Sequence, residues 1–161
     1  MKYYLCLGSN SGNRGKNLDT ALNRMVQQGM KILSCSSRYE TEPLGMPGQT
    51  WFFNQVVEVE TTLMPSDLLA WVKATEKKMG RDLTEELKSR VIDIDILLAD
   101  ERIICTEELQ IPHPGLRERN FVLVPLSEIA PEVIHPLLKK KIKDLLLESS
   151  DSHQVRLVDE F

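Results

Sequence analysis

The sequence has few of the residues that build disulfide-linked or zinc-bound proteins. Only three cysteines occur among 161 residues, Cys6, Cys35 and Cys105, and they are odd in number, widely spaced and set in apolar surroundings. This pattern favours buried thiols of a reducing compartment over disulfides or a zinc site. The three histidines are equally scattered, and neither H-x₃-H nor C-x₂-C spacing occurs.

Long apolar runs and a strong charge of one sign are missing as well. No apolar run reaches 18 residues, and residues 1–5 lead directly into Gly8-Ser9-Asn10 without the apolar core of a signal peptide. The net charge of −4 gives no support for nonspecific binding to nucleic acid or membrane. We therefore expect a cytoplasmic protein that binds neither.

The composition is that of a globular protein, with 42% hydrophobic and 27% charged residues. No internal repeat, low-complexity segment or linker divides the chain, so we predict one domain spanning residues 1–161. Strands and helices alternate with hairpin-like steps, which predicts an α+β fold with a mostly antiparallel sheet.

The predicted elements follow from periodicity and from turn residues. In chain order they are a strand at 3–7, a helix at 14–28 with Asn13 as N-cap, strands at 32–41 and 52–62, a helix at 65–79 ended by Gly80, a strand at 90–98, a Pro-punctuated segment at 112–136, a helix near 138–148 and a last strand at 154–158. Apolar residues are expected inward on the two long helices: Leu18, Ala21, Leu22, Met25 and Val26 on the first, and Leu68, Val72, Thr75 and Met79 on the second.

The most informative stretch is Arg90-Val91-Ile92-Asp93-Ile94-Asp95-Ile96-Leu97-Leu98. It reads as a strand with the isoleucines on one face and Asp93 and Asp95 on the other. The two carboxylates would lie ~7 Å apart along the strand. Such a pair, completed by substrate phosphates, is a common way to hold Mg²⁺. The alternative is the solvated side of a half-buried strand.

The stretch from Gly8 to Asn17 follows a strand and opens a helix, as a phosphate-binding P-loop does. The P-loop pattern needs Gly at position 10 and Ser or Thr at position 17, and both positions are Asn. We read a tight strand-to-helix turn instead. A nucleotide would have to bind without a P-loop.

Three further residues suit phosphate or nucleotide binding. Arg81 and Arg90 bracket a polar loop, which would bring both guanidinium groups onto a polyphosphate if it closed. The alternative is a solvated loop with weak surface ion pairs to Glu85 or Glu86. Glu76 falls near the buried face of its helix, where it would accept from an adenine amino group or a ribose hydroxyl, or else form a surface i,i+4 pair.

A second group of residues suits a flat heterocycle. Phe52 opens one strand and Phe121 another segment, so their rings would enclose a planar ligand whose edge the Asn54 amide reads. The alternative is that both rings belong to the core. His113 lies in a rigid turn between two prolines, where most histidines are surface or capping residues.

Taken in order, these motifs resemble the 6-hydroxymethyl-7,8-dihydropterin pyrophosphokinases of folate biosynthesis, from residue 1 to about 136. The matching motifs are Gly8-Ser9-Asn10, Thr41-Glu42-Pro43-Leu44-Gly45, Phe52-Phe53-Asn54, Glu76-x₃-Gly80-Arg81, Arg90-x₂-Asp93-Ile94-Asp95-Ile96-Leu97 and Pro112-His113-Pro114-x₄-Arg119-x-Phe121-Val122-Leu123-x-Pro125-Leu126-x-Glu128-Ile129-Ala130-Pro131. No single motif is decisive, but the ordered set is very specific.

The resemblance implies a ferredoxin-like core with helices on both sides of the sheet, and transfer of pyrophosphate from MgATP to the pterin hydroxymethyl oxygen with release of AMP. It implies small-molecule substrates, a monomer or weak homo-oligomer, and two Mg²⁺ ions at Asp93 and Asp95. It also implies three sets of site residues. These are Arg81 and Arg90 for catalysis; Lys73, Glu76, Arg90, Ile96, His113 and Arg119 for ATP; and Thr41, Leu44, Phe52, Asn54 and Phe121 for the pterin.

The chain departs from the family mainly between the two arginines. Leu87-Lys88-Ser89 stands where members often have Trp-Gly-Pro, Leu83 replaces a common Arg, and the loop is one residue shorter. Lys73 occupies the place of a nucleotide-contacting Gln, and Glu108 that of a basic residue. Two other functions stay open: a noncatalytic binding module on the same fold, and a different Mg²⁺-dependent nucleotidyl or phosphoryl transferase.

Overall fold

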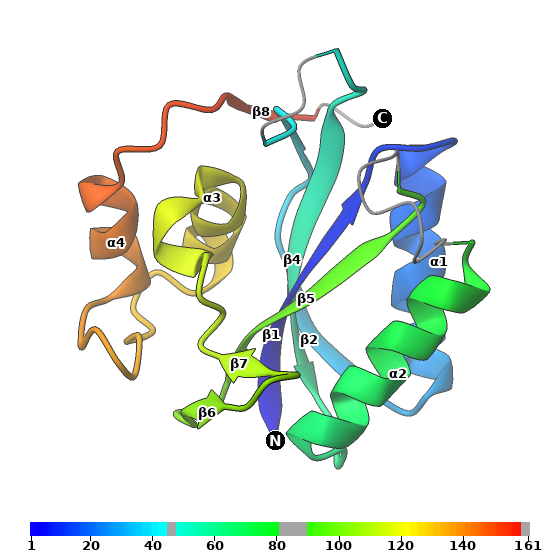
Figure 1. Cartoon of the computed structure of the whole chain (residues 1–161), viewed down its shortest axis with the longest axis horizontal. Coiled ribbons are helices and arrows are strands. Elements are labelled where there is room, and N and C mark those ends of the chain that lie inside the picture. The colour runs from blue at the N-terminus through cyan, green and yellow to red at the C-terminus, as the bar shows by residue number, and fades with distance from the viewer. Residues whose placement is uncertain (45–47, 81–89, 159–161) are drawn as a thin grey trace.

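The computed structural model describes residues 1–44, 48–80 and 90–158. Its first half alternates strands and helices (Figure 1): β1 Lys2–Ser9, α1 Arg14–Gln27, β2 Lys31–Cys35, β3 Tyr39–Thr41, β4 Phe52–Glu60, α2 Pro65–Lys78 and β5 Asp93–Ala99. Its second half adds β6 Ile104–Cys105, β7 Gln110–Ile111, a 3₁₀ turn at Leu116–Glu118, α3 Asn120–Ile129, α4 Ile142–Glu148 and β8 Val155–Leu157.

The main sheet has the strand order β5-β1-β4-β3-β8, and β2 also pairs with β4. Every strand pairing in the described ranges is antiparallel. With β2 and β3 counted as one interrupted strand, the path β1-α1-β2/β3-β4-α2-β5 is the β-α-β-β-α-β arrangement of ferredoxin-like folds. The predicted α+β class with a ferredoxin-like core is confirmed.

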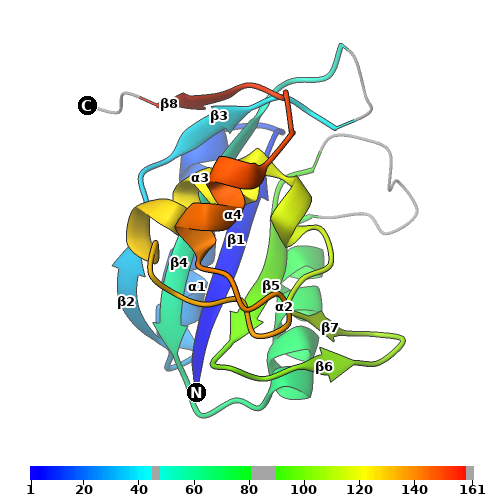
Figure 2. The same cartoon turned by 90° about the vertical axis from the view of Figure 1, so that its left-hand side faces the viewer.

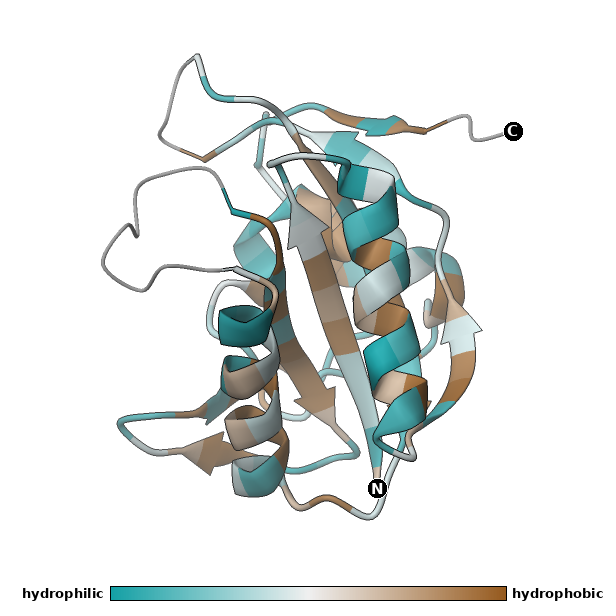
Figure 3. Ribbon diagram, turned by 90° about the vertical axis from the view of Figure 1, so that its right-hand side faces the viewer, coloured by the Kyte–Doolittle hydropathy of each residue, from teal (hydrophilic) through white to brown (hydrophobic). Residues whose placement is uncertain are grey.

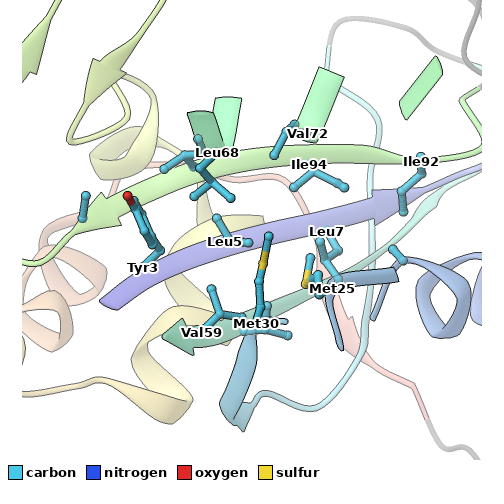
Figure 4. Close-up of a cluster of buried hydrophobic side chains, with 14 of the residues drawn as sticks. Tyr3, Leu5, Leu7, Met25, Met30, Val59, Leu68, Val72, Ile92 and Ile94 are labelled. Carbon is cyan, nitrogen blue, oxygen red and sulfur yellow. The ribbon is translucent and has the colours of Figure 1, made fainter. Parts of the chain in front are cut away.

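Helices cover both faces of this sheet, as expected (Figures 1 and 2). On one face, Leu5 and Leu7 of β1 pack with α1 and α2 in a cluster that also holds Met25, Leu68 and Val72 (Figure 4). The buried residues of α1 are Leu18, Ala21 and Met25, and Figure 3 shows that the neighbouring strands are largely hydrophobic. On the other face, a second cluster joins the sheet to α3 and α4; its members include Cys6, Val56, Leu97, Leu98, Val122, Leu123, Leu126, Ile142 and Leu145.

Several expected elements are confirmed at their ends. Asn13 caps α1 by accepting a hydrogen bond from the Lys16 backbone N–H at 3.0 Å. Gly80 follows α2 with a φ of +104°, a backbone conformation that suits glycine at a helix stop. The strand expected at 32–41 is interrupted at Ser36. Its N–H donates to the Val56 carbonyl, and its hydroxyl, in place of a main-chain carbonyl, accepts from the Val56 N–H.

Other expectations were wrong. Helix α3 was missed because Pro125, the sixth of its ten residues, reads as punctuation; a proline inside a helix removes one i→i−4 hydrogen bond and argues against a helix. The strand of the two aspartates begins at Asp93 rather than at residue 90, and α4 begins at Ile142 rather than near 138. Cys35 and Cys105 are exposed, since they lie at the ends of short strands; all three cysteines are free thiols. Val26 of α1 is also exposed.

Among the described residues, no helix has the length and apolar character needed to cross a membrane.

Candidate active site

One row of paired residues crosses three strands of the sheet. Asp93 of β5 lies opposite Gly8 of β1, and Gly8 lies opposite Asn54 of β4. Directly paired residues of an antiparallel sheet place their side chains on the same face. Two strand spacings amount to ~10 Å, so a carboxylate and an amide face the same space across a residue that has no side chain.

The two aspartates of β5 lie on the sheet face that α3 covers, as the alternation of strand side chains predicts. Their side chains are 20% exposed for Asp93 and 43% exposed for Asp95, whereas Ile94 and Ile96 point into the opposite core. Arg90 Nη1 donates to both carboxylate oxygens of Asp93, at 3.0 and 3.2 Å. The pair is therefore partly buried and already has one cation beside it.

Arg90 is fixed through its main chain by Asn10, which comes just after β1. The Arg90 N–H donates to Asn10 Oδ1 at 2.6 Å, and the Asn10 N–H donates to the Arg90 carbonyl at 3.0 Å. Asn10 is 2% exposed, and its side-chain amide also donates to the carbonyl of Thr50 at 3.2 Å. The residue that breaks the P-loop pattern thus positions the arginine predicted to be catalytic.

The turn from β1 into α1 confirms the reading of a tight strand-to-helix connection. Asn17, the second residue that departs from the P-loop pattern, donates to the Ser11 carbonyl at 2.7 Å and to Ser9 Oγ at 3.1 Å. These bonds use the side chain to close the turn.

His113 lies beside the aspartates. Its Nε2 is 4.0 Å from Asp95 Oδ1, and its Nδ1 accepts a hydrogen bond from the Gly115 N–H at 3.1 Å. Burial lowers the pKa of His113, and Arg119 lowers it further, while Asp95 opposes the change. Since Nδ1 is an acceptor, the neutral ring carries its proton on Nε2, the atom that faces Asp95.

Arg119 directly precedes α3 and is partly buried. Its guanidinium carbon lies 5.9 Å from the centre of the Phe121 ring. A Cβ on Gly115 would come within 2.6 Å of Arg119 Nε and 2.7 Å of its Cζ, so this glycine leaves the space in which the guanidinium lies.

The remaining residues predicted to contact ATP differ in how they are placed. Glu76 of α2 is 6% exposed and accepts from the Ile94 N–H of β5 at 2.9 Å, so the alternative of a surface i,i+4 pair is wrong. Lys73, one turn earlier on α2, is exposed. The side chain of Ile96 is buried in the core, so a nucleotide would meet this residue through its main chain on the edge strand β5.

Asn54 is buried, at 4% exposed. Its Nδ2 donates to Thr41 Oγ1 of β3 at 2.6 Å, and Thr41 is also buried. A Cβ on Gly8 would lie 2.6 Å from Asn54 Oδ1 and 3.4 Å from Phe52 Cδ1. Gly8 therefore leaves the space that the Asn54 amide occupies.

Phe52 and Phe121 are both partly buried, and they come from different elements. Phe52 begins β4 on the face that carries Asn54, whereas Phe121 lies in the first turn of α3 and not at the start of a strand. Leu44 is 38% exposed at the end of the segment that follows β3. Phe53, on the opposite face, packs in the core of α1 and α2 under the guanidinium of Arg14.

Arg81 and the polar loop that follows it lie outside the described residues. The predicted closure of this loop therefore stays a prediction.

The residues present fit magnesium that is shared with a phosphate substrate. Asp93 and Asp95 offer oxygen ligands on one face, and no group of three or more His, Cys, Asp or Glu within the described ranges forms a metal cluster. Mg²⁺ is usually bound by one or two carboxylates together with phosphates and water, rather than by a complete protein cage.

Sequence reasoning missed the roles of Gly8 and Asn10. Gly8 lies near the end of β1 and Asn10 just after it, where glycine and asparagine are common for local reasons, so their long-range partners Asn54 and Arg90 left no separate signal. The ordered motif Gly8-Ser9-Asn10 was the only indication that these residues do more than close a turn.

The chain resembles known proteins over most of its length. Residues 4–131 match the family model for 7,8-dihydro-6-hydroxymethylpterin-pyrophosphokinase. A 2-amino-4-hydroxy-6-hydroxymethyldihydropteridine pyrophosphokinase of Aquifex aeolicus is 39% identical over 147 residues, which cover 91% of each chain. The folic acid synthesis protein fol1 of Schizosaccharomyces pombe is 37% identical over 159 residues, 98% of this chain.

Some of these relatives are much longer. The chain spans 22% of the length of the S. pombe protein and 20% of the Dictyostelium discoideum protein FOL1, to which it is 45% identical over 135 residues. Among solved structures, a Plasmodium falciparum HPPK-DHPS with pteroate superposes on 91% of this chain and 42% of its own length, with a TM-score of 0.75 and 18% identity. That likeness supports the fold.

Proposed function

The chain belongs to the 7,8-dihydro-6-hydroxymethylpterin-pyrophosphokinase family, and on that premise we propose that it transfers pyrophosphate from ATP to 6-hydroxymethyl-7,8-dihydropterin. The hydroxymethyl oxygen forms a bond to the β-phosphorus of ATP. The bond from that phosphorus to the oxygen bridging to the α-phosphorus breaks, and this oxygen leaves with AMP. The hydroxyl proton is released, and the product is the pterin diphosphate of folate biosynthesis.

The observation that carries this proposal is the row Asp93, Gly8, Asn54 on one face of the sheet. A site for this reaction must hold a charged triphosphate and a neutral heterocycle side by side. The carboxylates of β5 suit the first task and the buried amide of β4 suits the second. Only a glycine stands between them, so the two ligands can approach each other.

On the phosphate side, Asp93 and Asp95 would hold magnesium, and Arg90 and His113 would contact the phosphates. Magnesium bound there would offset the phosphate charge and make the β-phosphorus easier to attack. Arg90 needs little reorganisation, because Asn10 holds its main chain and Asp93 already orients its guanidinium. His113 presents an N–H toward the same space, which suits a phosphate oxygen. Glu76 and the main chain of Ile96 would contact the nucleoside.

On the pterin side, recognition would use one hydrogen-bonding edge and two flat faces. The bond to Thr41 holds the Asn54 amide in one orientation, and the missing side chain of Gly8 leaves room for its oxygen. A pterin edge carries donors and acceptors side by side, which an oriented amide can match. Phe52 and Phe121 would stack on the ring, and Leu44 would contact its outer side.

Product analysis tests the proposal. Purified protein with MgATP and 6-hydroxymethyl-7,8-dihydropterin should form AMP and the pterin diphosphate in equal amounts, and omission of the pterin should stop AMP formation. ADP would instead indicate phosphoryl transfer, and free pyrophosphate would indicate nucleotidyl transfer. Binding of both ligands without turnover would support the noncatalytic module.

We also propose that the protein acts as a monomer or weak homo-oligomer on small molecules. Sedimentation velocity over a range of concentrations tests the first part; a tight assembly at nanomolar concentration would contradict it.

A further inference from the structure

The residue at the N-cap position of helix α3 does not cap the helix with its side chain. Arg119 occupies the N-cap position and makes no side-chain cap bond, and the first turn contains no acidic residue. The first N–H groups of a helix lack partners inside the helix and favour a nearby anion. Asp151, 31 residues later in the chain, supplies it: its Oδ2 accepts from the Asn120 N–H at 2.8 Å.

Asp151 is itself held firmly. Its side chain is 5% exposed, and its Oδ1 accepts from the His153 N–H at 3.0 Å and lies 2.6 Å from His153 Nδ1. The Asn120 amide returns a bond to the Asp151 carbonyl at 3.1 Å. Burial raises the pKa of Asp151, but the bonds from Asn120 and His153 outweigh it and lower the pKa below its ordinary value. The cap is therefore ionised at neutral pH.

The same segment continues into the strand that borders the predicted pterin residues. Figure 2 shows the C-terminal segment passing from α4 to β8, which lies along β3. Thr41 pairs with Val155, the Gln154 N–H donates to Glu42 Oε1 at 2.6 Å, and the Glu42 N–H donates to the Gln154 carbonyl at 3.2 Å. Residues 151–157 thus contact both the start of α3, next to Phe121, and the end of β3, at Thr41.

The two ends of α3 are anchored by different parts of the chain. Near its C-terminal end, Glu128 accepts from the Ser37 N–H at 2.7 Å and from the Tyr39 hydroxyl. That anchor lies within residues 4–131, which match the family model. The anchor at the N-terminal end, Asp151, lies beyond them.

We propose that Asp151 is a positioning residue of the pterin site, which acts by capping α3 and so fixing the Phe121 ring opposite Asn54. This inference rests on the proposed function. Without the cap, the first turn of α3 loses its anchor, and the ring loses its fixed place. Of the predicted ATP contacts, Glu76 and His113 lie on other elements and keep their own bonds, and only Arg119 adjoins the first turn of α3.

The test compares Asp151→Ala with two matched variants. Asp151→Asn retains an oxygen that accepts from the Asn120 N–H, so it should recover most of the effect. Glu148→Ala removes an exposed acid from the end of α4, whose bonds go to Lys140, and serves as the control. Pterin Kd by titration calorimetry, KM for both substrates, kcat and the melting temperature are measured for each.

Asp151→Ala should weaken pterin binding about tenfold, the scale of one lost N-cap. KM for ATP should change less than threefold, and Glu148→Ala should match wild type. A lower melting temperature with unchanged pterin Kd would show a merely structural role and overturn the proposal. If Asp151→Ala does not fold, Asp151→Glu is measured instead: its longer side chain keeps the charge but moves the carboxylate away from the Asn120 N–H, and a wild-type pterin Kd in this variant overturns the proposal.

The outcome that contradicts the proposed function differs from the one that contradicts this inference alone. A wild-type protein that binds no pterin would contradict that function, and this inference with it. A wild type that binds pterin, with Asp151 variants that bind it equally well, would contradict this inference alone.

Discussion

Side chains of β5 and its neighbours build the charged half of the candidate site, whereas the neutral half is gathered from β3, β4, α3 and the C-terminal segment. In the charged half, Arg90 contacts Asp93 three residues away. In the neutral half, Asn54 bonds Thr41 across a strand pair, and the helix that carries Phe121 is capped from Asp151. The ion pair of the charged half joins residues close in sequence, whereas both of these contacts of the neutral half join separate elements of the fold.

This difference has a physical basis. Charges attract over several ångströms, and half-exposed carboxylates tolerate small shifts because water and counterions compensate for them. A buried amide must be paired, and stacking rings must lie at van der Waals distance. The neutral half therefore needs the firmer scaffold. Changes at Asp93 or Asp95 should remove chemistry and spare the fold, while changes around Asn54 and Phe121 should act on pterin affinity.

The largest effect is expected for Asp95→Ala. Loss of one of two carboxylates should lower kcat by on the order of 10³-fold or more, because magnesium would lose a ligand. The melting temperature should stay at or above that of wild type, because removal of one of two neighbouring anions relieves repulsion in the metal-free protein. Steady-state kinetics and thermal melts measure both. An Asp95→Ala enzyme with wild-type turnover would show that the metal assignment is wrong.

The two arginines sharpen the comparison within the charged half. Arg90 is held by Asn10 before any substrate binds, whereas Arg81 directly follows the helix stop at Gly80. A residue that acts only after loop closure contributes mainly to the transition state. Arg81→Ala should therefore lower kcat on the order of 10²-fold with little change in either KM. Arg90→Ala should change both kcat and KM.

Lys78→Ala, an exposed cation at the end of α2, is the control for these arginine variants. It should behave as wild type. If Arg81→Ala stays within a few-fold of wild-type kcat, the shortened loop does not bring this arginine to the phosphates.

The aspartates and Arg90 also show which features of the candidate site the sequence could predict. The alternation of Asp93 and Asp95 with isoleucines predicted their common face, because strand side chains alternate whatever the rest of the fold does. The bond from Arg90 to Asn10 spans 80 residues, and no local pattern reports it. Helix α3 was missed because Pro125 and the absence of an acid in its first turn both argue against a helix, and its cap comes from elsewhere. The sequence therefore predicted the common face of the two aspartates, but not the long-range bonds that support the candidate site.

In the neutral half, Phe121→Ala should weaken pterin binding by roughly 1–3 kcal/mol, the scale of one lost stacking partner. MgATP affinity should hardly change, because all the predicted nucleotide contacts except Arg119, which directly precedes α3, lie on other elements. Phe53→Ala is the matched control, since this ring is partly buried on the opposite face of the sheet. It should lower stability and leave pterin affinity unchanged. Equal losses for both ligands in the Phe121 variant would mean that this ring is only a core residue.

Substitutions at two glycines should give the smallest effects, each on one half of the site, because each glycine leaves space for one residue predicted to contact a ligand. A methyl group at Gly8 would meet Asn54 Oδ1 at 2.6 Å, and one at Gly115 would meet Arg119 Nε at 2.6 Å. Asn54 is short, buried and bonded to Thr41, so it has nowhere to move without losing that bond. The end of an arginine is flexible and can shift.

Gly8→Ala should therefore raise the pterin Kd about tenfold, the scale of one displaced hydrogen bond in a buried site, and leave the ATP Kd unchanged. Gly115→Ala should do the reverse and more weakly, raising the ATP Kd about threefold with pterin binding intact. Calorimetric titration of each variant with each ligand gives the four values. If Gly8→Ala weakens both ligands equally, β1 has moved as a whole, and the glycine serves the packing of the sheet instead of the orientation of Asn54.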